Sequence, residues 1–205
     1  MTTTPSPDDE RLKSQVSKEL DEAKALAKSF DFEKVKNGEW FLTLLKQVIN
    51  AYDRNARAAY FQKKYPGLPS DEIADILTSV TVRYATIAGA VTGVAASANE
   101  IAALGSGGMT AALFVGTIGA EMLYLSSIQM RLMLDMSVLY DLQLDPEDPE
   151  DILMIFGYAL GVAPAEFIGK GLQVAARAGT KDIVKKVITK GTREALLKFG
   201  KKLGF

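Results

Sequence analysis

The sequence predicts an all-α protein, a helical bundle around a small-residue-rich antiparallel hairpin of two long helices at about residues 71–104 and 109–142. Three observations lead to this prediction. Both segments consist mainly of apolar and small residues, and each segment is longer than a typical β-strand. The glycine-rich stretch at residues 105–108, which separates the two segments, is the strongest helix-breaking signal in the chain. No segment shows the sustained alternation of β-branched residues that is typical of a sheet.

Two further helices are expected before the hairpin. Pro7 suits a first helical position, and the acidic residues after it favour a helix N-terminus, so a helix is expected to about residue 29. Its apolar stripe is thin, which is typical of a surface helix or an arm: Val16, Leu20, Ala23 and Ala27. A second helix is expected from about residue 39 to residue 64, where Pro66 and Gly67 end it.

An acidic linker follows the hairpin. It holds six carboxylates between Asp141 and Asp151 but lacks the glycine and the distal glutamate of a calcium-binding loop. Asp148 and Pro149 instead match the N-cap and the first position of a helix. No metal site and no cofactor are therefore predicted. The expected organisation is an N-terminal tail and arm (residues 1–38), a helical core domain (39–179) and a basic amphipathic extension (180–205).

The chain contains neither cysteine nor histidine. Disulfides, thiolate catalysis and zinc sites built on cysteine are thereby excluded. The commonest general base and the commonest transition-metal ligand are also missing. Since no catalytic motif is found either, a non-enzymatic protein is expected.

The small-residue hairpin raises the question of a membrane span. Residues 101–120 carry no charge, and twenty uncharged residues are enough to cross a bilayer. The glycines at 105–108 interrupt this stretch, its Ala, Gly, Ser and Thr residues insert weakly, and Glu121 would be costly inside a bilayer. A buried helical core is the favoured interpretation, with constitutive or triggered membrane insertion as the alternative.

Charged residues within the second long helix form a candidate site. Glu121, Arg131 and Asp135 fall at helical spacing on one face, and Arg131 and Asp135 are four residues apart. In an antiparallel hairpin, Asp75 and Arg83 would lie near their level. The favoured interpretation is a structural polar cluster of Asp75, Arg83, Arg131 and Asp135 that fixes the register of the helices. The alternative is a catalytic site using Glu121, Arg131 and Asp135.

The C-terminal extension is strongly basic, although the whole chain has a net charge of only −1. Isoleucine and valine form one face of the first of two expected short helices, leucine and phenylalanine form one face of the second, and lysine lies on the opposite face of both. This pattern is typical of helices that bind an anionic membrane surface. Nucleic acid is a less favoured partner because no recognised binding motif is present. The predicted contacts to an anionic partner are Lys181, Lys185, Lys186, Lys190, Arg193, Lys198, Lys201 and Lys202.

The first ten residues are polar and acidic and lack the basic start and apolar stretch of a signal peptide. A cytoplasmic location is therefore expected, with peripheral attachment at the inner face of the membrane.

Several short motifs, in this order and spacing, resemble the EcsC family of bacterial proteins. They are Thr92-Gly93 in the small-residue helix, Gln129-Met130-Arg131 in the next helix, Tyr140-Asp141 at its end, and Asp148-Pro149-Glu150 followed by Ile152-Leu153. The resemblance covers about residues 74–178. It implies a link to secretion, because the founding member is encoded beside an ABC transporter.

Together these patterns predict a non-enzymatic accessory protein that is associated with a membrane or a transporter and acts through helix packing and its basic tail. Its expected partners are an anionic membrane surface or a membrane protein complex. Two alternatives remain open. One is a hydrolase that uses carboxylates of the long apolar helix, and the other is a helical module that binds a partner or a second copy of itself.

Overall fold

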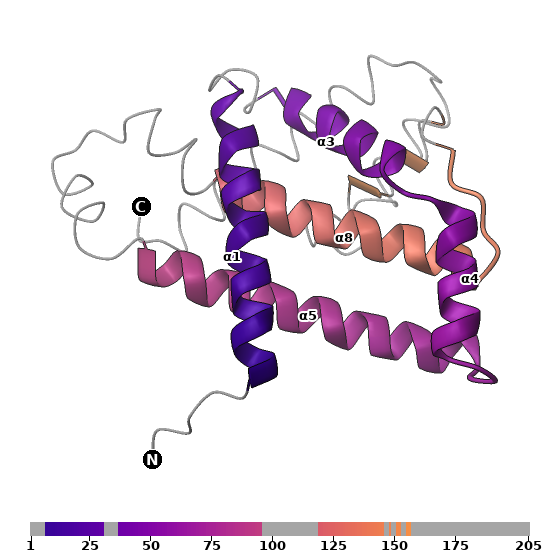
Figure 1. Ribbon diagram of the computed structural model, residues 1–205. Coiled ribbons are helices and arrows are strands. Elements are labelled where there is room, and N and C mark those ends of the chain that lie inside the picture. The colour runs from indigo at the N-terminus through magenta and orange to yellow at the C-terminus, as the bar shows by residue number, and fades with distance from the viewer. Residues whose placement is uncertain are drawn as a thin grey trace, which may run out of the picture. The chain divides into compact units, whose positions relative to one another are not determined.

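The computed structural model describes residues 7–30, 37–95, 119–145, 148, 151–152 and 155–156. These residues contain five α-helices and no strand, which confirms the all-α prediction (Figure 1). The helices are α1 (Pro7–Lys28), α3 (Glu39–Asn50), α4 (Arg54–Lys64), α5 (Ser70–Ala95) and α8 (Gly119–Leu139).

The chain divides into two compact units, one of Met1–Phe32 with Ser79–Tyr124 and the other of Glu33–Thr78 with Leu125–Phe205. We call them unit 1 and unit 2. The predicted boundaries near residues 38 and 179 stay a prediction, because residues 31–36 and 157–205 lie outside the described residues. The predicted hairpin turn at 105–108 lies outside them too.

Within unit 1, α1 has the thin apolar stripe that the sequence predicts. Val16, Leu20 and Ala27 are buried, while most of the other side chains of α1 are exposed. The hydroxyl of Tyr84 on α5 donates a hydrogen bond of 3.3 Å to the side-chain oxygen of Gln15. A narrow stripe of small and branched side chains is thus enough to bury one face of this polar helix.

Unit 2 departs from the sequence prediction between residues 39 and 64, where two helices replace the single helix expected. The break falls at residues 51–53, because the carboxylate of Asp53 accepts the backbone N–H of Ala56 at 2.9 Å and so caps α4. A side chain that satisfies a helix N-terminus in this way starts a new helix and competes with continuation of the old one. The single-helix prediction is wrong for this physical reason.

Within unit 2, the first turns of α5 pack antiparallel to the last turns of α8. The hydroxyl of Ser70 donates to the carbonyl of Leu139 at 3.0 Å. Further along the pair, a core cluster on α4 and α5 packs against side chains of α8, and α4 crosses the end where α5 begins and α8 ends (Figure 1). The cluster consists of Phe61, Ile73 and Leu77 with Tyr65, Leu132, Met136, Val138 and Leu139 packed against it.

A second apolar contact in unit 2 involves α3 and the segment after the acidic linker. Trp40 and Phe41 are fully buried, and the ring of Phe41 meets that of Phe156 edge-on at 4.7 Å between centroids. The backbone N–H of Ile152 bonds to the carbonyl of Asp148, which is the bond expected if Asp148 is the residue that precedes the helix. Aromatic burial therefore holds residues 155–156 against α3.

Among the described helices, α8 is the most enclosed. Arg131 is the one exposed residue among the 21 of this helix. A helix that is apolar around most of its circumference requires neighbours on several sides. Among the described helices, none combines the length and the apolar character that crossing a bilayer demands.

The C-terminus of α8 ends in a Schellman motif. The N–H of Leu142 bonds to the carbonyl of Ser137 at 2.8 Å, and the N–H of Asp141 bonds to that of Val138 at 3.4 Å. This pattern requires a left-handed residue, usually glycine, and Asp141 fills the position with φ 49°. An L-residue in this conformation is strained.

We expect Asp141→Gly to raise the free energy of unfolding by about 0.5–1 kcal/mol, because glycine relieves the left-handed strain. The exposed ion pair of Asp141 with Arg54 contributes little in opposition. Asp141→Ala removes the same carboxylate without relieving the strain and should lower stability. Urea unfolding measures both variants. A larger loss in the glycine variant than in the alanine variant would contradict this explanation of the helix end.

Candidate functional site

A buried carboxylate is the centre of the polar contacts in unit 2. Asp135 on α8 is 5% exposed, and both of its oxygens accept hydrogen bonds. Arg57 binds it with two nitrogens, Nε to Oδ1 at 2.7 Å and Nη2 to Oδ2 at 2.6 Å. The hydroxyl of Tyr52 donates to Oδ1 at 2.8 Å. The carboxylate is therefore neutralised by a bidentate guanidinium and bonded by a phenol.

Two aromatic rings of α4 also lie close to the guanidinium of Arg57. Its guanidinium carbon lies 5.0 Å from the ring centroid of Tyr60 and 4.9 Å from that of Phe61. The hydrogen bonds to Asp135 raise the pKa of Arg57. A planar cation that both stacks on rings and forms a two-pronged contact has little freedom to leave.

Tyr52 lies in the break between α3 and α4. Burial, followed by the charge of Asp135 and the hydrogen bond to it, raises the pKa of the Tyr52 hydroxyl well above its usual value. The phenol thus remains a donor to Asp135. The Asp53 cap that starts α4 places Tyr52 before the break and Arg57 after it.

A second arginine of α4 binds the end of α8. Arg54 donates to the hydroxyl and to the carbonyl of Ser137, each at 3.0 Å, and its Nη2 lies 3.5 Å from Asp141 Oδ1. The last carbonyls of a helix carry partial negative charge, so a cation is favourable here. Arg54 and Arg57 together fasten the start of α4 to the last two turns of α8.

The structure gives Asp135 a different partner from the one expected. The sequence pairs it with Arg131, but Arg131 is exposed and the ion pair of Asp135 is with Arg57. Asp75 lies between Ser70 and Leu77, near the level of Asp135, yet its side chain is exposed. Arg83 is exposed on α5 and belongs to unit 1.

The candidate residues predicted from the sequence did not include Tyr52, Arg54 or Arg57. Asp53 is the residue in the sequence that indicates the helix break, because aspartate is favourable at an N-cap and unfavourable inside a helix. Recognising a new helix start there would have drawn attention to the arginines in the first turn of α4.

The alternative catalytic site receives no geometric support from the described residues. Asp135 is engaged by three donors, Arg131 is exposed, and Glu121 is half-buried in the first turn of α8. A general base or nucleophile must reach substrate from a pocket. To act as a general base or a nucleophile, Asp135 would first have to break its ion pair with Arg57.

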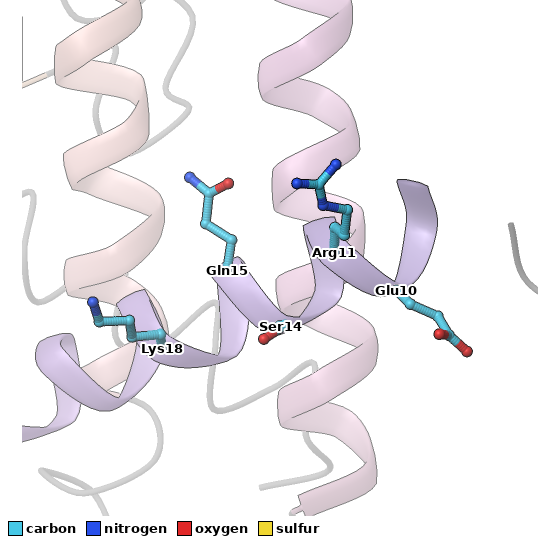
Figure 2. Close-up of a pocket in the computed structure, with 5 residues that line it drawn as sticks. All are labelled: Glu10, Arg11, Ser14, Gln15 and Lys18. Carbon is cyan, nitrogen blue, oxygen red and sulfur yellow. The ribbon is translucent and has the colours of Figure 1, made fainter. Parts of the chain in front are cut away.

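One shallow depression in the structure lies on α1 rather than on α8. Figure 2 shows five described residues that line it, all on this one helix, with Arg11 and Gln15 pointing to the same side and Glu10 pointing away. Their side chains do not converge on a common point, so the depression lacks the arrangement of a catalytic centre. It is lined by Glu10, Arg11, Ser14, Gln15 and Lys18.

The predicted anionic-partner residues, Lys181 to Lys202, lie outside the described residues and stay a prediction. In the described part of the chain, no three acidic side chains are grouped to hold a metal ion. Comparison of the chain with family models, curated proteins and solved structures finds no match.

The raised pKa of Tyr52 predicts a pH dependence. The unfolded chain releases the phenol proton near pH 10, whereas the folded chain keeps it to higher pH. The folded state then binds more protons, so the stability contributed by Tyr52 is complete below about pH 10 and is lost as pH rises further.

Urea unfolding between about pH 9 and pH 11.5 should therefore show a steeper loss of stability for the native chain than for Tyr52→Phe. Equal slopes for the native chain and Tyr52→Phe would contradict the account.

Proposed function

We propose that the protein is a non-enzymatic helical accessory protein that attaches to an anionic membrane surface through its basic C-terminal extension. The observation that carries this proposal is the uneven distribution of charge. Ten basic and two acidic residues lie between Lys170 and Phe205, whereas the chain as a whole has a net charge of −1. A link to a transporter or to secretion rests on the resemblance to the EcsC family.

The free energy of attachment is a sum of small contributions from several residues. Each lysine near an anionic bilayer contributes about 1 kcal/mol, and an apolar helix face adds burial in the headgroup region. Ile183, Val187 and Ile188 provide such a face beside Lys181, Lys185 and Lys186. Several lysines acting together thus give useful affinity without a binding pocket.

The engagement of Asp135 favours this function over hydrolysis. Its two oxygens bind Arg57 and Tyr52, and such a fully bonded carboxylate stabilises packing rather than attacking a substrate. Helix packing in unit 2 would then serve as the scaffold from which the extension reaches the membrane.

Flotation with phosphatidylcholine vesicles containing phosphatidylserine tests the attachment. Replacing Lys181, Lys185, Lys186 and Lys190 by glutamine removes up to about 4 kcal/mol of attraction to the bilayer. Binding to the vesicles should therefore weaken at least tenfold. Binding of the native chain should also fall as salt is added.

The matched control replaces four exposed lysines of α1 by glutamine, which changes the net charge equally: Lys13, Lys18, Lys24 and Lys28. It should bind nearly as well as the native chain. Failure of the native chain to float with anionic vesicles, or equal weakening in both variants, would refute attachment through the extension.

A further inference from the structure

Unit 2 exposes apolar side chains at the end where α8 stops. Leu142 is 57% exposed, Tyr140 44% and Leu68 38%. Leu68 precedes Ser70, whose hydroxyl bonds to the carbonyl of Leu139, so the three lie around the same helix end. Large side chains exposed together at one place are typical of a surface that binds another element.

Carboxylates lie beside Tyr140 and follow it in the chain. Asp71 accepts the Tyr140 hydroxyl at 2.6 Å, and this bond, with further contributions from the charges of Asp71 and Asp75, raises the pKa of Tyr140. The side chain of Asp141 is fully exposed, and Asp145 is exposed four residues on. We call this the Tyr140/Leu142 surface: Leu68, Tyr140 and Leu142 with Asp71, Asp75, Asp141 and Asp145.

The surface is electronegative. Among the contacts of the described residues, Arg54 approaches it at 3.5 Å from Asp141, and two of the Arg54 nitrogens are already bonded to Ser137. A partner that complements the surface must therefore bring an apolar stripe for Tyr140 and Leu142, together with positive charge for the carboxylates.

The chain itself contains a segment of this chemistry. Residues 180–205 combine apolar residues at helical spacing with eight basic residues and two acidic ones. About 25 residues connect Phe156, which is buried near α3, to Lys181, and even a helical connection of that length spans about 37 Å.

We propose that residues 180–205 dock on the Tyr140/Leu142 surface of the same molecule when no membrane is present. The lysines that contact lipid in the proposed function are then occupied by carboxylates of unit 2. Docking and membrane attachment exclude each other, so the surface sets the threshold of lipid charge at which the protein attaches. The membrane half of this competition rests on the proposed function, whereas docking itself does not.

Limited trypsin digestion of the full chain, followed by mass spectrometry, tests the docking. The variant Asp141→Asn, Leu142→Ser, Asp145→Asn should be cut at Lys181 to Lys202 at least fivefold faster than the native chain. Asparagine is chosen at 141 because it tolerates the left-handed conformation. Equal cleavage rates in the variant and the native chain would overturn the proposal.

The matched control is Asp21→Asn, Glu22→Gln, Leu42→Ser, which removes two exposed carboxylates and one exposed leucine elsewhere. It should be cut at the native rate. Raising the salt concentration should speed cleavage of the native tail relative to a control peptide, and this measurement needs no variant. Cleavage of the native tail that is insensitive to salt would also count against the proposal.

Two further measurements distinguish docking within one molecule from docking between two copies and from membrane attachment. Protection that is lost when the native protein is diluted a hundredfold would indicate docking between two copies and would overturn docking within one molecule. In flotation, the variant Asp141→Asn, Leu142→Ser, Asp145→Asn should bind anionic vesicles more tightly than the native chain. If no chain floats but the trypsin difference is present, the proposed function fails and the docking stands.

Discussion

The packing of unit 2 depends on the need to neutralise one buried carboxylate. An ionised carboxylate removed from water is costly unless it is paired and fully hydrogen-bonded. Asp135 meets this requirement through Arg57 and Tyr52, which lie on either side of the break between α3 and α4. The pairing therefore fixes the position of two helices against α8, and the rings beside Arg57 extend the contact into the apolar cluster around Phe61.

The same contacts of α4 lie beside the Tyr140/Leu142 surface. Arg54, three residues before Arg57, binds the last turn of α8 and approaches Asp141, whose left-handed conformation turns the chain out of the helix. Tyr140 and Leu142 are exposed at that turn. The proposed regulation thus uses a surface whose geometry is set by structural ion pairs, while the proposed membrane contact uses residues of the extension.

Sequence patterns predicted the helical class, the bounds of α1 and the buried character of α8, because these follow from local spacing of apolar residues. They did not predict the partner of Asp135. Arg131 is near it in sequence, but the two lie on differently buried parts of the helix, and the actual partner is 78 residues away. Three-dimensional packing decides which of several arginines pairs with the buried carboxylate. Here the packing depends on a helix break at Asp53 that the local apolar spacing does not reveal.

A comparison of two arginine substitutions tests the central claim most directly. Arg57→Met leaves Asp135 buried without its cation and should lower the free energy of unfolding by about 3 kcal/mol. Arg131→Met alters an exposed side chain and should change it by less than about 0.5 kcal/mol. Urea unfolding at neutral pH with this contrast would support the account. Equal effects, or a larger loss from Arg131→Met, would contradict it.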